Sequence, residues 1–186
     1  FPELQGIMGR YYAIHDGDSP EVGQAIEQHY RPRFAADALP ALGAPTVLAL
    51  ADKLDILVGI HGTGLVPSGD RDPFALRRHA LAVLRILVEH DLPLALFDLL
   101  ALARQGFDRS IELAEDVTSE LVGFILDRAV GYLHDRGYAA EEIESVLDLY
   151  RAQDLPANQL LPRLDAIRTF RRLPEAGGAA APRYVA

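Results

Sequence analysis

A run of apolar residues at helical spacing, interrupted by charges, limits the possible folds of this chain more than any other stretch. Within residues 46–60 the apolar side chains recur every three or four positions: Val47, Leu50, Ala51, Leu54, Leu57 and Val58. Asp52, Lys53 and Asp55 lie among them. A buried carboxylate without a partner is strongly unfavourable. The stretch therefore predicts a central helix whose charged residues meet partners on another element.

A glycine-rich turn follows this helix and leads into a second one. The helical pattern is broken by four glycines and a proline: Gly59, Gly62, Gly64, Pro67 and Gly69. Asp72-Pro73 fits a helix start, because an aspartate side chain accepts free backbone N–H groups and proline suits the first helical position. In the helix expected from Pro73, Arg77 shares a side with apolar residues and borders the core. We expect Arg77 to pair with Asp52 or Asp55.

The rest of the chain is predicted to be helical as well. Apolar periodicity and helix-end signals place further helices over residues 4–12, 20–31, 94–105, 115–136, 140–152 and 160–172. Residues 34–45 are rich in proline and small side chains, which favours a loop. No strand alternation, internal repeat or coiled-coil heptad is present in the sequence. The prediction is an all-α fold, with a disordered Gly/Ala-rich tail over residues 174–186.

Composition narrows the function classes. The 186 residues are 49% hydrophobic, enough for one domain or a compact domain with an appended helical piece. The absence of cysteine excludes disulfides and thiolate metal sites, and fits a cytoplasmic protein. No apolar run reaches membrane-spanning length and no signal segment is evident, so no membrane partner is expected. A net charge of −9 argues against a surface that binds nucleic acid everywhere, but allows one basic face.

Five arginines are candidates for such a face. Arg31 and Arg33 flank Pro32 after a predicted helix, while Arg71, Arg78 and Arg85 recur every seven residues. The last three align along one side if the helix includes Arg71, and Arg85 would lie on its outer face. The planar guanidinium group suits phosphate because it donates two parallel hydrogen bonds. From spacing alone, an ordinary solvated helix face with one or two salt bridges is the alternative.

The sequence carries no motif for nucleophilic catalysis. No serine lies in a GxSxG context, and no cysteine is available as a nucleophile. The glycine-rich run at residues 61–64 follows a helix instead of a strand and lacks a P-loop lysine. We therefore assign no catalytic residue and no nucleotide-binding motif.

Four stretches also carry a likeness to a known family: FPELQGIMGRYYA (1–13), AIEQHYRPRFAADALP (25–40), LADKLDILVGIHGTGLVPSGDRDPFALRR (50–78) and LAVLRI (81–86). They resemble the β subunit of bacterial heterotetrameric glycyl-tRNA synthetase, with DPFALRR as the most specific run. The resemblance extends to about Pro174. It implies a segment from the middle of a longer subunit, with a degenerate HD-domain-like helical bundle over residues 1–90 and additional packed helices over residues 91–173.

The resemblance to the HD-domain fold raises the question of a metal site. HD-domain hydrolases bind metal through a histidine, an adjacent His-Asp pair and a later aspartate. Asp52 resembles that last aspartate and His29 a histidine of the preceding helix, but the central His-Asp pair is missing from its helix. We expect a hydrogen-bonded polar pair of Asp52 and His29, and no metal. The alternative is a metal-dependent phosphohydrolase.

The same resemblance implies a function for the segment. In this family an α2β2 enzyme attaches glycine to tRNA(Gly), and the α subunit performs the chemistry with ATP and Mg²⁺. This chain would then need no cofactor of its own. Its partners would be tRNA(Gly), the α subunit and the rest of the β subunit. A purely structural helical scaffold is a further alternative.

Overall fold

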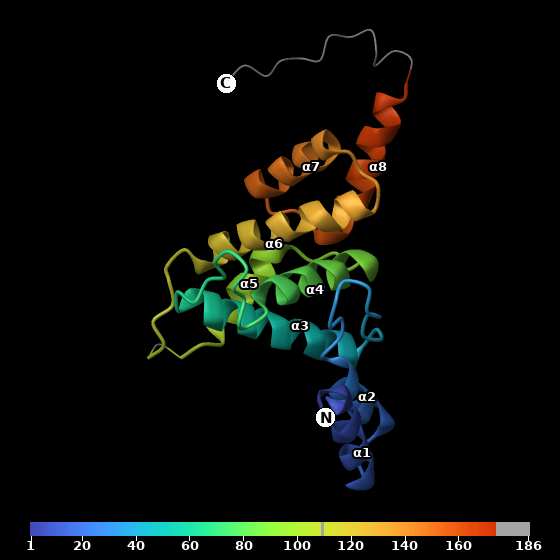
Figure 1. Ribbon diagram of the computed structural model, residues 1–186, viewed down its shortest axis with the longest axis vertical. Helices are drawn as coiled ribbons and strands as arrows, with labels where there is room; N and C mark the ends of the chain where they lie inside the picture. The colour runs from blue at the N-terminus through green and yellow to red at the C-terminus, as the bar shows by residue number, and fades with distance from the viewer. Residues whose placement is uncertain (109, 174–186) are drawn as a thin grey trace.

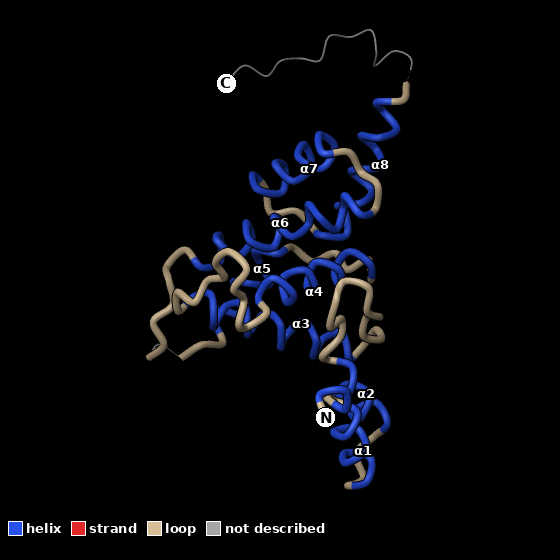
Figure 2. Tube along the Cα trace, in the orientation of Figure 1, coloured by secondary structure: helices blue, strands red, loops and turns tan. Residues whose placement is uncertain are grey.

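The computed structural model describes residues 1–108 and 110–173, and within these ranges the chain is helical and has no β-strand (Figure 2). The predicted all-α fold is confirmed. The described residues form eight α-helices: α1 (Ile7–His15), α2 (Pro20–Gln28), α3 (Ala44–Ile56), α4 (Leu76–Glu89), α5 (Leu96–Gln105), α6 (Val117–Asp135), α7 (Ala140–Ala152) and α8 (Leu160–Arg171). The predicted tail, residues 174–186, lies outside the described residues.

The helices pack side by side in an elongated stack (Figure 1). The α1–α2 hairpin lies at one end and contacts the body through α2 and α3. From there α3 packs on α4, α4 on α6, α6 on α7 and α7 on α8, while α5 bridges α3 and α6. One buried apolar cluster runs from α3 to α8 and includes Leu57, Leu87, Leu121 and Leu164. Both predicted modules contribute to this core, so their division at residue 90 stays a prediction.

The central helix continues past the glycine where it was expected to end. After α3 the chain forms a π-helical turn, Leu57–His61, and Gly59 lies within it. The predicted break at Gly59 is therefore wrong. A Cβ atom at this position would lie 2.9 Å from the Phe107 ring, so glycine serves the close approach of that ring and not a turn.

Helix α4 begins at Leu76, three residues later than predicted. Ala75 has a left-handed backbone with φ of 55°, and residues 73–74 form a turn in front of the helix. The Asp72 carboxylate accepts hydrogen bonds from the backbone N–H groups of Leu76, at 2.8 Å, and Arg77, at 3.0 Å. Asp72 thus satisfies the free N–H groups as expected, but across a longer loop.

The other helix boundaries agree with prediction within three residues. At α2, the Ser19 hydroxyl accepts a hydrogen bond from the Val22 N–H, and Pro20 occupies the first helical position, as the sequence indicated. Helix α1 begins later than expected because residues 2–4 form a separate 3₁₀ turn. None of the helices in the described ranges is long and apolar enough to cross a membrane.

Candidate nucleic-acid interface

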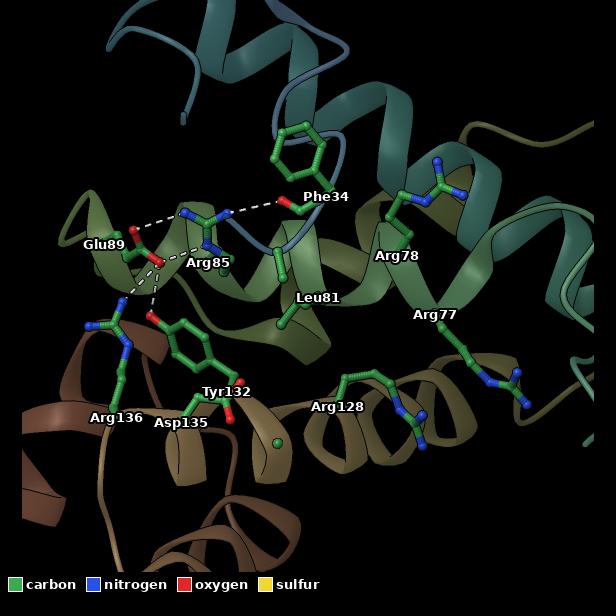
Figure 3. A pocket seen from close by; sticks show the side chains of 12 residues that line it. Phe34, Arg77, Arg78, Leu81, Arg85, Glu89, Arg128, Tyr132, Asp135 and Arg136 are labelled. Atoms are coloured by element: carbon green, nitrogen blue, oxygen red, sulfur yellow. Dashed lines mark hydrogen bonds and ion pairs between the residues drawn. The ribbon is translucent and has the colours of Figure 1, made fainter. Parts of the chain in front are cut away.

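An arginine-rich cavity of about 700 Å³ lies between α4 and α6, beside the loop that follows α2 (Figure 3). Its lining combines five arginines with two carboxylates, two aromatic rings and three small or aliphatic residues: Phe34, Ala35, Arg77, Arg78, Leu81, Arg85, Glu89, Arg128, Gly131, Tyr132, Asp135 and Arg136. The excess of guanidinium groups over carboxylates makes this cavity basic in a chain whose net charge is −9. It is therefore suited to an anionic ligand.

At one end of the cavity, here called the paired end, two arginines, Arg85 and Arg136, share the carboxylate of Glu89. Glu89 lies 2.8 Å from the Arg85 Nε and 3.0 Å from an Arg136 Nη, and it accepts a 3.1 Å hydrogen bond from the Tyr132 hydroxyl (Figure 3). Burial by itself would raise the pKa of Glu89, but the hydrogen bonds and charges of Arg85, Tyr132 and Arg136 lower it below its ordinary value. Glu89 is thus held ionised at neutral pH.

Arg85 also fixes the loop that borders the cavity. Its Nη1 donates to the backbone carbonyls of Phe34, at 3.4 Å, and Asp37, at 3.1 Å. Its side chain is only 9% exposed. The predicted position of Arg85 on a solvated outer face is therefore wrong, because the loop after α2 folds over that face of α4. Arg85 holds the cavity wall together, and its guanidinium is occupied by partners within the chain.

At the other end, here called the open end, Arg77, Arg78 and Arg128 meet no carboxylate among the described residues (Figure 3). Arg77 donates one hydrogen bond to the backbone carbonyl of Gly69. The Nε of Arg128 is buried without an acceptor, and its guanidinium lies 5.7 Å from the centre of the Phe124 ring. Because these three guanidinium groups line the cavity without a carboxylate partner, this end is suited to a ligand that supplies hydrogen-bond acceptors and negative charge.

The expected ion pair of Arg77 with Asp52 or Asp55 is not formed. Asp55 is exposed and Asp52 half-buried, and neither makes an ion pair with the described part of the chain. Because α4 begins at Leu76, Arg77 lies in its first turn, where its side chain reaches Gly69 and the cavity. The late start of the helix explains why this prediction failed.

The buried charge of the central helix is Lys53. Its side chain is 2% exposed, and its Nζ donates a 2.6 Å hydrogen bond to the backbone carbonyl of His29. Burial lowers the pKa of Lys53 to about 8, although the charge of Asp52 opposes this shift. Lys53 thus ties α3 to the end of α2. The hydrogen bond expected between the side chains of Asp52 and His29 is not formed.

The His29 side chain has local partners instead. Its Nδ1 lies 2.9 Å from the carbonyl oxygen of Ile26, and its ring packs at 3.9 Å from the Tyr30 ring centre. Within residues 1–108 and 110–173, no group of three or more histidine, aspartate or glutamate side chains is placed to share a metal ion.

The remaining arginine candidates lie outside the cavity. Arg31 pairs with Glu27 at 3.5 Å, and Arg33 pairs with Asp37 at 3.0 Å. Arg71 is exposed in the loop before α4. Arg78 and Arg85 alone among the five sequence candidates line the cavity, and RNA contact by any of the five stays a prediction.

Sequence reasoning missed the contribution of α6. Arg128, Tyr132 and Arg136 recur every four residues in the helix predicted over residues 115–136, so they share one face of it. The sequence alone therefore predicts that these three side chains lie on one face of the helix. What the sequence did not show was that this face lies opposite Arg77 and Arg78 of α4 across the cavity.

Comparison with known proteins agrees with the sequence motifs. A family model described as Glycyl-tRNA synthetase beta subunit matches residues 1–148, a range that includes every residue lining the cavity. The glycine–tRNA ligase β subunit of Acidovorax sp. (strain JS42) is 55% identical over 182 residues, which cover 97% of this chain and 24% of that protein.

Two further β subunits with the same name give a consistent result. The Delftia acidovorans protein is 54% identical over 181 residues, and the Ralstonia nicotianae protein is 49% identical over 181 residues. Each alignment covers 97% of this chain and 25% of the relative. The chain thus spans about a quarter of the length of the curated relatives it matches. On the family match and these identities, the chain belongs to the glycyl-tRNA synthetase β-subunit family.

Proposed function

We propose that this chain is a tRNA-holding part of a glycine–tRNA ligase β subunit, and that it binds the phosphate backbone of tRNA(Gly) at the open end of the cavity. The names of its relatives support the substrate. The ATP- and Mg²⁺-dependent attachment of glycine then belongs to an α subunit of an α2β2 enzyme in the cytoplasm. This chain contributes binding and assembly, and no reacting group.

The observation that carries the proposal is the grouping of Arg77, Arg78 and Arg128 without a carboxylate in an acidic chain. An acidic surface repels a polyanion in general, whereas this cluster of guanidinium groups attracts it. Guanidinium groups bind phosphate oxygens through charge-assisted hydrogen bonds. The acidic remainder of the chain disfavours other orientations of the RNA, which favours one mode of approach.

The proposal is tested with Arg78→Glu in the complete β subunit assembled with its α subunit. Arg78 is exposed and makes no ion pair with the described residues, so its reversal leaves the internal hydrogen bonds intact. We expect the Kd for tRNA(Gly) to rise about tenfold at low salt, and the salt dependence of binding to weaken, because fewer counterions are released. Filter binding at two salt concentrations and aminoacylation kinetics measure both effects.

Arg172→Glu is the matched control. Arg172 is exposed after the end of α8 and lies outside the cavity, and its reversal changes the net charge by the same amount. Equal losses in the two variants would mean that only overall charge matters. Unchanged binding and kinetics in Arg78→Glu would contradict the proposal and favour a structural scaffold.

A further inference from the structure

We infer that the cavity between α4 and α6 accepts one unpaired nucleotide of the bound RNA, with its base inside the cavity and its phosphate on the arginines of the open end. This inference rests on the proposed tRNA binding and adds to it. The open end by itself requires only a phosphate backbone, whereas the shape and lining of the cavity indicate a base as well.

The first observation is the open space of the cavity. Its volume of about 700 Å³ is in the range typical of sites for small organic ligands. Helix α6 presents Gly131 here, and a Cβ atom at this position would meet nothing within 4 Å. On the α4 side the lining residue is Leu81, which lies between Arg85 and Arg78 (Figure 3). At Leu81 and Gly131 the lining is thus apolar and leaves open space, as a flat aromatic ligand requires.

The second observation is an exposed aromatic ring held over this space. Phe34 is 58% exposed although it is apolar, and Figure 3 shows its ring beside the cavity, on the opposite side from Tyr132. Its backbone carbonyl accepts a hydrogen bond from Arg85, so the loop that carries it is held against α4. Nucleobases stack on such rings irrespective of sequence.

The third observation concerns the polar groups around the space. Arg78 and Arg128 line the cavity and have no carboxylate partner in the described ranges, so their guanidinium groups suit the phosphate of a nucleotide. The Asp135 carboxylate lines the opposite end and can accept hydrogen bonds from a base edge or a ribose hydroxyl. A base stacked and paired within a duplex cannot enter the cavity. The ligand is therefore an unpaired nucleotide.

The test is to fill the cavity without changing its charge. Gly131→Leu, made in the complete β subunit assembled with its α subunit, places a side chain in the open space while retaining every arginine. We expect about tenfold weaker binding of tRNA(Gly), as for the loss of base stacking, and unchanged binding of a blunt-ended RNA duplex. The melting temperature should not fall, because leucine is a better helix former than glycine.

Gly123→Leu is the matched control. Gly123 lies in the same helix, a Cβ atom there also meets nothing within 4 Å, and it does not line the cavity. It should bind tRNA(Gly) as the unmodified enzyme does. Phe34→Ala provides a second variant, since its ring is exposed and its removal leaves the internal packing intact. This variant should also weaken binding of tRNA(Gly) several-fold and spare the duplex.

The outcomes separate this inference from the proposed function. If Gly131→Leu and Phe34→Ala bind tRNA(Gly) normally while Arg78→Glu does not, the nucleotide site is wrong and the phosphate contact stands. If the cavity variants weaken tRNA and duplex equally, no base enters and the inference is again overturned. If Arg78→Glu has no effect either, both proposals fail.

Discussion

The two ends of one cavity use the same amino acid in opposite ways. At the paired end, Arg85 and Arg136 share the Glu89 carboxylate, and Arg85 also donates to two backbone carbonyls. At the open end, Arg77, Arg78 and Arg128 meet no carboxylate of the described chain. Arginines whose donors are used internally stabilise the fold, whereas those with free donors remain available for a ligand.

The largest expected difference between the two ends is in stability. Arg85→Met removes one of the two arginines that pair with Glu89, and it leaves the backbone carbonyls of Phe34 and Asp37 without their donor. We therefore expect the free energy of unfolding to fall by about 3 kcal/mol. Arg78→Met at the exposed open end should change it by less than about 0.5 kcal/mol. Urea unfolding of both variants measures the two changes in the free energy of unfolding. Similar losses would erase the distinction between the ends.

Lys53 extends the comparison to a buried cation whose partner is a carbonyl and not a carboxylate. Its pKa is about 8 in the folded chain against an ordinary value of 10.5. Between these pH values the unfolded chain binds a proton that the folded chain has released, so stability should increase as the pH rises through this window. The expected gain is about 2 kcal/mol from about pH 7.5 to about pH 9.5.

The Lys53→Met variant isolates this contribution. The tyrosines that also titrate at high pH are the same in both proteins, so the difference between their urea-unfolding profiles reports Lys53. We expect the free energy of unfolding of the variant to lack the increase with pH that Lys53 causes. Parallel profiles across the window would show that Lys53 is not desolvated in the folded state.

The smallest expected effect concerns Glu89 in acid. Its pKa is lowered in the folded state, so its contribution to stability is present above the ordinary pKa of 4.5 and is lost as the pH falls through the lower, folded-state value. Because the carboxylate is partly solvated, this contribution should be about 1 kcal/mol or less. Comparing acid unfolding of the chain with that of Glu89→Gln measures it. A steeper acid dependence in the variant would contradict the assigned role.

Some of this site was predictable from local sequence. The apolar periodicity located the helices that form the cavity walls, because the face a helix buries depends on spacing along the chain. Asp72 marked the start region of α4 for a similarly local reason. The spacing of Arg128, Tyr132 and Arg136 defines one face of α6 in the same way.

Other features depended on contacts between distant segments. Gly59 was predicted to break a helix, but the approach of Phe107 explains its small size. Arg85 was predicted on a solvated face, but the loop carrying Phe34 covers it. In both cases the deciding neighbour is about fifty positions away, which no helical period encodes.

The sequence by itself determined that this chain is helical, which stretches form helices and which family it resembles, because periodicity, helix-end chemistry and motifs are all local. Only the tertiary structure decided which arginines are neutralised and which face the cavity. That outcome depends on the carboxylates and carbonyls that other segments bring within hydrogen-bonding distance, and those distances are set by packing rather than by position along the chain.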